Sequence, residues 1–211
     1  MTSIVWFRRD LRLEDQAALL AAVGRGRPIT PVYILDDETP KHRQMGGASR
    51  WWLHHSLKSL DAALRARGSR LILRKGPAAQ VLAQLTREVS ASAIHCLRHY
   101  EPWWRNAERS LQEILPVGTS LIRHEGLYLM PPGSVKTGSG GQFKIYTPFW
   151  RALSQHMPPP PPRAAPTHIP APEAWPGSDN LDDWKLLPSQ PDWSGGMQAF
   201  WKPGEEGAKE R

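Results

Sequence analysis

The sequence predicts an α/β protein with a five-stranded, mostly parallel, doubly wound (Rossmann-like) sheet and helices on both faces. Short apolar runs rich in β-branched residues alternate with longer segments in which apolar residues recur at helical spacing. Glycine or proline separates most of these segments. After residue 154 this pattern stops, and the composition favours an extended, proline-rich linker instead.

Each expected element has its own local signal. Leu53, Leu57, Leu60 and Leu64 recur at steps of four, three and four residues, which predicts one apolar face on the longest helix. Pro31 removes a backbone donor from the second strand and favours a sheet edge or a strand start. The expected strands cover 4–7, 29–35, 70–74, 93–97 and 120–122, and the expected helices cover 17–23, 46–67, a segment opened by Pro77, and 102–115.

Composition narrows the class of protein without deciding its function. The net charge of +7 indicates either a solvated basic surface or affinity for an anion, such as nucleic acid or a phosphate-bearing cofactor. The single cysteine, Cys96, excludes an intrachain disulfide and a cysteine-based zinc cage, and it is expected to be an inert core thiol. No signal peptide or membrane-spanning run is recognisable, so we expect a cytoplasmic protein without membrane contact.

The region 131–211 is expected to be an interdomain connector that follows an α/β domain over 1–130. Its proline run at 158–162 favours polyproline II and argues against a core of its own. The glycines at 138 and 140 indicate a turn in this connector rather than a phosphate cradle. Four tryptophans are spaced along the rest without an evident partner surface in the chain: Trp175, Trp184, Trp193 and Trp201.

Four motifs in order resemble the amino-terminal domain of the photolyase/cryptochrome family. Residues 5–15, which read Val-Trp-Phe-Arg-Arg-Asp-Leu-Arg-Leu-Glu-Asp, are similar to the opening segment of that family. Residues 100–103, Tyr-Glu-Pro-Trp, are similar to its Glu-Pro turn. The Thr-Gly-Ser-Gly and Tyr-Thr-Pro-Phe-Trp sequences within 137–150 and the Pro-Gly-Glu at 203–205 complete the resemblance.

The resemblance implies an antenna chromophore in this domain: a folate, a deazaflavin or FMN. It also implies that FAD, the lesion pocket and the electron-transfer tryptophans belong to a helical domain absent from this chain. That helical domain, in cis or as a separate chain, is the implied partner, and damaged DNA is the partner of the complete enzyme. The chain alone is therefore expected to be inactive in repair.

Residues at the expected strand ends are candidates for holding the chromophore, because ligands of open α/β sheets bind there. Flat rings need aromatic walls, and an anionic tail needs arginine or lysine. The candidates are Phe7, Arg8, Asp10, Asp36, Arg50, Trp51, Glu101, Trp103 and Trp104.

Each candidate also has a purely structural interpretation. Arg8, Asp10 and Arg12 would form a surface salt-bridge cluster, Trp51 would pack in the core or an interface, and Glu101 would only begin a helix. The histidines, His42, His54, His55 and His99, are expected to face solvent rather than to bind metal.

The favoured hypothesis is the amino-terminal part of a deoxyribodipyrimidine photolyase, which contributes chromophore binding to light-driven repair of pyrimidine dimers. One alternative is a cryptochrome-type blue-light receptor domain, which this part of the sequence does not separate from a photolyase. A second alternative is a truncated or split α/β module without activity of its own.

Overall fold

The computed structural model describes residues 1–39 and 44–211 and contains one parallel sheet. Its strands are β1 (Thr2–Phe7), β2 (Ile29–Leu35), β3 (Ile72–Lys75), β4 (Ala91–Leu97) and β5 (Ser120–His124). Its helices are α1 (Ala17–Val23), α2 (Gly47–Arg65), α3 (Ala78–Glu88), α4 (Pro102–Ile114), α5 (Tyr146–Ser154), the 3-10 turn η1 (Leu181–Trp184), α6 (Met197–Phe200) and α7 (Glu205–Lys209). The predicted fold class is confirmed.

The strand order is β3-β2-β1-β4-β5, and every neighbouring pair is parallel. The chain winds outward from β1 to β3 and then returns to the other side of β1 to form β4. The carboxyl ends of β1 and β4 therefore flank the point where the winding reverses, which is the usual place for a ligand in such sheets.

The expected edge position of Pro31 is wrong, because β2 lies inside the sheet between β1 and β3. Pro31 is in register with Val5 of β1, whereas the pairing with β3 begins only at Val32. The N–H of Ile29 donates to Pro170 O (2.8 Å), away from β1, and alternate residues of a strand share a direction. The donor missing at Pro31 thus falls just before the β3 ladder starts.

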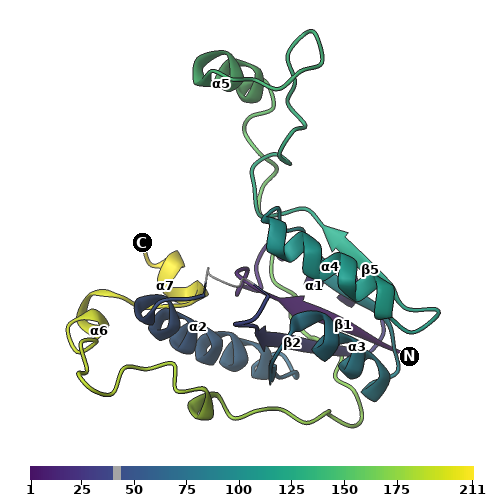
Figure 1. Cartoon of the computed structure of the whole chain (residues 1–211), viewed down its shortest axis with the longest axis vertical. Coiled ribbons are helices and arrows are strands. Elements are labelled where there is room, and N and C mark those ends of the chain that lie inside the picture. Colours follow the sequence, from purple (N-terminus) through teal and green to yellow (C-terminus); the bar gives the residue numbers. More distant parts are fainter. Residues whose placement is uncertain (40–43) are drawn as a thin grey trace.

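Helices cover both faces of the sheet, and the side chains of β1 divide between them. Val5 and Phe7 belong to the core cluster under α1 and α2, and Ile4 and Trp6 belong to the cluster under α3 and α4. The predicted leucine face of α2 is confirmed: its four leucines are all buried. Figure 1 shows α2 on one side of the sheet and α3 and α4 on the other.

An arm of the chain, residues 127–157, leaves the α/β body after β5 and carries α5 at its tip (Figure 1). The helix α5 was not predicted, because Pro148 interrupts the pattern; proline is tolerated here because it falls in the first helical turn. Several large apolar side chains of the arm are exposed: Tyr128, Leu129, Ile145, Tyr146 and Trp150.

After the arm, the proline-rich segment returns and runs along the α/β body (Figure 1). Besides the bond between Ile29 and Pro170, the N–H of Asp179 donates to Leu73 O (2.8 Å) beside β3. The segment forms no core of its own, but it adds Ile169, Trp184 and Leu186 to the core under α2.

The path of this segment along the α/β body gives its four tryptophans contact surfaces that were not evident from the sequence. Trp184 is buried and packs against Tyr33, with 6.2 Å between ring centroids. The other three contact α2 or the loop before β3: Trp175 lies under the Arg70 guanidinium, Trp193 lies against Gly47, and Trp201 packs edge to face on Trp52.

Candidate chromophore site

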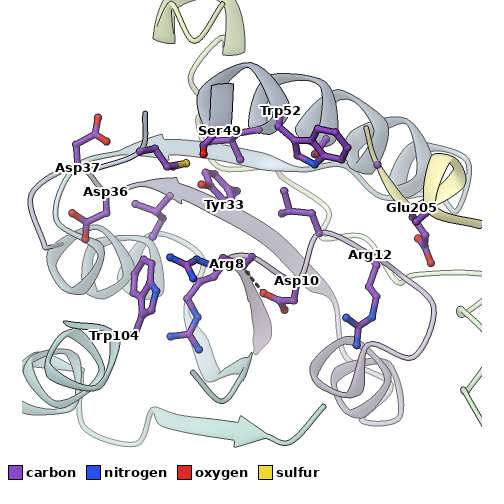
Figure 2. A pocket seen from close by; sticks show the side chains of 18 of the residues that line it. Arg8, Asp10, Arg12, Tyr33, Asp36, Asp37, Ser49, Trp52, Trp104 and Glu205 are labelled. Atoms are coloured by element: carbon purple, nitrogen blue, oxygen red, sulfur yellow. Dashed lines mark hydrogen bonds between the residues drawn. The ribbon is translucent and has the colours of Figure 1, made fainter. Parts of the chain in front are cut away.

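A cavity of about 430 Å³ lies at the carboxyl ends of β1 and β2. Figure 2 shows Trp52 and Tyr33 above Arg8, with Asp36 and Asp37 on one side and Glu205 on the other. The lining residues come from the loop after β1, the end of β2, the first half of α2, the start of α4, and α7: Arg8, Arg9, Asp10, Leu11, Arg12, Tyr33, Ile34, Asp36, Asp37, Met45, Ser49, Trp52, Leu53, Ser56, Trp103, Trp104, Gly204, Glu205 and Ala208.

Arg8 is held inside the protein at the floor of this cavity. Its guanidinium forms an ion pair with Glu108 (Nη1 to Oε1, 2.8 Å) and donates to Leu97 O. It also lies 4.3 Å from the ring centroid of Trp6 and 5.4 Å from that of Trp104. Because Arg8 and Asp10 are only 4% and 2% exposed, the alternative of a surface salt-bridge cluster is wrong for both.

Asp10 is a buried carboxylate whose hydrogen bonds keep it ionised. Burial by itself would raise its pKa, but the nearby His99 ring (Nε2 to Oδ1, 3.8 Å), hydrogen bonds from the Arg8 N–H and the Gln16 side chain, and the Arg8 charge hold the pKa below its usual value. The Arg8 N–H to Asp10 Oδ1 distance is 2.9 Å. Arg12 fixes the same loop, because its guanidinium donates to three backbone carbonyls, among them Gly126 O (3.0 Å).

Asp36 forms part of the wall and also caps a helix. Its carboxylate accepts the N–H groups of Glu38 (3.0 Å), Thr39 (2.8 Å) and Ala78 (2.8 Å), and Ala78 is the first residue of α3. Arg50 does not line the cavity; it forms an ion pair with Asp37 (2.7 Å), a lining residue that the sequence interpretation missed.

Two predicted site residues lie in the core instead of the cavity wall. Phe7 is 0% exposed and Trp51 is 1% exposed, and neither lines the cavity. Trp52 takes the place expected for Trp51: it lines the cavity and is 40% exposed. The signal was available in the helix, because Ser49, Trp52, Leu53 and Ser56 follow the spacing of a single helical stripe.

The segment after β4 supplies the remaining wall. Trp103 and Trp104 line the cavity, as the sequence suggested, and Trp104 meets Trp6 edge to face at 5.9 Å between ring centroids. Glu101 lies outside the lining. It directly precedes α4, as the structural interpretation predicted. Its carboxylate also forms an ion pair with Arg9 (2.9 Å).

The histidines are less exposed than predicted. His54 and His99 are each 2% exposed and His55 is half-buried, whereas His42 lies outside the described residues. Burial removes the rings of His54 and His55 from water, which disfavours their charged form and lowers the pKa of both. Within 1–39 and 44–211, no group of three His, Cys, Asp or Glu side chains is placed to hold a metal ion.

The glycine-rich sequence at 137–141 forms a turn, as predicted, and lies in the arm rather than at the cavity. The Thr137 N–H donates to Gly141 O (2.9 Å), and Gly140 has a φ of 81°, which favours glycine. In the part of the chain that the structure describes, no helix combines the length and apolar character needed to cross a membrane.

The cavity offers four aromatic rings and a mixed set of charges. Tyr33, Trp52, Trp103 and Trp104 supply the rings, and burial raises the pKa of Tyr33, so its phenol stays neutral. Four carboxylates and three guanidiniums stand among the lining residues. Rings with a few polar groups are what a flat, heteroaromatic ligand needs, and a volume of about 430 Å³ lies within the range of small-molecule sites, roughly 300–1,000 Å³.

This fold and cavity define an α/β domain with a cavity of small-molecule size at its strand ends. Residues 3–169 match the family model described as DNA photolyase. The chain belongs to the DNA photolyase family. It is 42% identical over 209 residues to a deoxyribodipyrimidine photo-lyase of Agrobacterium fabrum, a match that covers 99% of this chain and 43% of that protein.

A solved structure and a plant relative also belong to photolyase or cryptochrome proteins. A bacterial class III photolyase from Agrobacterium tumefaciens superposes with a TM-score of 0.91 at 42% identity, over 99% of this chain and 43% of that one. Cryptochrome-1 of Arabidopsis thaliana is 34% identical over 170 residues, 79% of this chain and 25% of that protein. The chain thus spans less than half the length of these relatives and is homologous to an amino-terminal part of them.

Proposed function

We propose that this chain is the light-harvesting part of a deoxyribodipyrimidine photolyase and that the cavity at the ends of β1 and β2 holds its antenna chromophore. The observation that carries this proposal is the set of four rings around one cavity. Members of the family bind a flavin and an antenna chromophore. The chromophore of this chain would be a folate, a deazaflavin or FMN, and when bound it would supply absorption of near-ultraviolet or blue light.

The residues of this chain would bind and orient such a ring. The exposed face of Trp52 offers a stacking surface opposite the floor formed by Arg8 and Trp104. The ionised Asp10 would accept a hydrogen bond from a ring N–H or amino group. Arg9, whose side chain is 66% exposed, is positioned at the protein surface to attract an anionic tail.

In this proposal, electron transfer to a pyrimidine dimer takes place in the part of the photolyase that this chain does not match. We propose a helical, FAD-binding partner for this chain, in cis or as a separate polypeptide, and the arm supports this. Its Ile145 and Tyr146 side chains are 69% and 71% exposed, a large apolar surface on a segment that stands off the body. We also propose that the chain acts on damaged DNA together with this partner and that the protein is cytoplasmic.

A cryptochrome-type light receptor is the second candidate, because identity to Cryptochrome-1 of Arabidopsis thaliana reaches 34% over 79% of the chain. The identity of 42% over 99% of the chain to the photo-lyase favours repair. Binding of DNA that contains a pyrimidine dimer, measured on the chain together with its helical partner, would separate the two functions.

The direct test is to purify the chain, record its absorption spectrum, denature it, and identify what is released. A near-ultraviolet or blue band that leaves with a folate, deazaflavin or flavin supports the proposal and names the chromophore. A spectrum of tryptophan alone, with no uptake of these compounds when they are added, contradicts chromophore binding. The illuminated chain with added FAD is expected not to split thymine dimers. Splitting would contradict the proposal that repair requires the helical partner.

A further inference from the structure

The segment 201–209, here called the closing segment, forms one wall of the cavity although it is far from the other walls in sequence. Trp201 packs edge to face on Trp52, with 5.7 Å between ring centroids, and Trp52 itself lines the cavity. Figure 2 shows Glu205 at the edge of the site, on the opposite side from Asp36 and Asp37. The closing segment contributes three lining residues: Gly204, Glu205 and Ala208.

Glu205 ties the closing segment to the loop after β1. Its Oε2 accepts the N–H of Leu13 (2.8 Å), and its Oε1 accepts the N–H of Glu14 (2.8 Å), so one carboxylate holds two consecutive backbone donors. Hydrogen bonds to an ionised acceptor are stronger than neutral ones. The same loop carries Asp10 and Arg12 into the cavity, so Glu205 also fixes the position of this second wall.

Two further contacts seat the closing segment. Lys209 Nζ lies 2.9 Å from Glu14 Oε2, and this ion pair raises the pKa of Lys209. Gly204 has a φ of 107°, and a Cβ atom there would lie 2.4 Å from Ser59 Oγ of α2. Only glycine permits both this backbone conformation and this close approach to α2.

We propose that Glu205 is the positioning residue that latches the closing segment onto the β1 loop and thereby completes the cavity. The inference rests on the proposed function in taking the cavity as the chromophore site. A ligand that touches the closing segment binds the latched form alone, so binding and latching stabilise each other. Loss of the latch opens one side of the cavity and weakens the site without removing a ring.

Hydrogen–deuterium exchange on the whole chain, without ligand, tests the latch directly. Glu205→Ala is expected to raise amide exchange at Leu13 and Glu14 about tenfold or more and to expose the amides of 205–209, because the two donors lose their acceptor. The matched control is Glu206→Ala, which removes an exposed neighbouring carboxylate that pairs with Lys209 (3.3 Å). Exchange at Leu13 and Glu14 that stays unchanged in Glu205→Ala would overturn the latch.

Gly204→Ala provides a second route that keeps the Glu205 carboxylate. The added methyl group is expected to unseat the closing segment and raise exchange over 205–209, while the circular dichroism of the α/β body stays unchanged. Unchanged exchange would count against the close seating on Ser59. This variant keeps the test decisive if Glu205→Ala is poorly folded.

Ligand titration then separates the latch from the proposed function. With FMN and 5-formyltetrahydrofolate as probes, Glu205→Ala is expected to bind about tenfold more weakly than Glu206→Ala. Equal affinity in the two variants would overturn the contribution of this wall. Absence of binding in the wild-type chain would count against the chromophore function, whereas the exchange experiment alone would decide the latch.

Discussion

The Arg8 guanidinium and the Glu108 carboxylate form an ion pair of 2.8 Å, with side chains only 1% and 4% exposed. It joins the end of β1 to α4 directly beneath the cavity. Arg123 of β5 adds a second contact to the same carboxylate (2.5 Å). Three elements that are far apart in the sequence are thus fixed around one buried charge, and the cavity floor depends on them.

Glu108→Ala should lower the free energy of unfolding by about 3–5 kcal/mol, because it leaves Arg8 buried without its counter-charge. Chemical denaturation monitored by tryptophan fluorescence measures the loss. Arg9→Ala is the matched control: Arg9 pairs with Glu101 at the surface, and exposed pairs contribute about 0–1 kcal/mol. Similar losses in the two variants would contradict the special role of the buried pair.

Trp184→Ala should destabilise the α/β body by about 3–5 kcal/mol, although Trp184 belongs to the proline-rich connector. The residue is 8% exposed and packs on Tyr33 of β2, so its removal leaves a cavity in the core. Trp193→Ala, at a residue that is 45% exposed, should lose less than about 1 kcal/mol by the same denaturation assay. A small effect at Trp184 would show that the connector is not part of the folded unit.

The stability of the fold should fall in mild acid because of His95. Burial, assisted by His124 and Arg25, lowers the pKa of His95 to about 4 from 6.5. Below pH 6.5 the unfolded chain therefore binds a proton that the folded chain rejects, so stability is complete above that pH and decreases as the pH falls toward 4. The free energy of unfolding should lose up to about 3 kcal/mol over this window. His95→Gln should flatten this part of the profile, and an unchanged slope would contradict the assignment.

Trp52→Ala should weaken chromophore binding about tenfold or more, because it removes an exposed ring from the cavity wall. Trp150→Ala removes a ring of similar exposure, 45% against 40%, from α5 on the arm and should leave the affinity unchanged. Fluorescence titration of the chromophore identified from the purified chain compares the two. Equal losses would indicate a binding site outside the cavity.

Cys96 should resist alkylation in the folded protein. It is the only cysteine in the chain and is 0% exposed, and burial raises its pKa to about 12. The thiolate that reacts with iodoacetamide is therefore nearly absent at neutral pH. Mass spectrometry should find the thiol unmodified under native conditions and fully modified in denaturant, and rapid native labelling would contradict its burial.

Local patterns in the sequence were sufficient to predict the fold class and the protein family. The leucine stripe of α2 and the apolar runs of β1 and β2 each encode burial through spacing within a few residues, and the predicted ends of these three elements lie within two residues of the observed ones. The position of the cavity at the strand ends was likewise predictable, because parallel strands bring their carboxyl ends to one edge of the sheet. Arg8, Asp10, Asp36, Trp103 and Trp104 do line the cavity there.

Only the tertiary structure decided which side chains share the site. Trp51 and Trp52 are neighbours in sequence, but one faces the core and the other the cavity, since successive helical residues point in directions about 100° apart. The Glu205 carboxylate contacts Leu13 across 192 residues. Local spacing carries no information about such a contact, because it depends on the path by which the connector returns over α2.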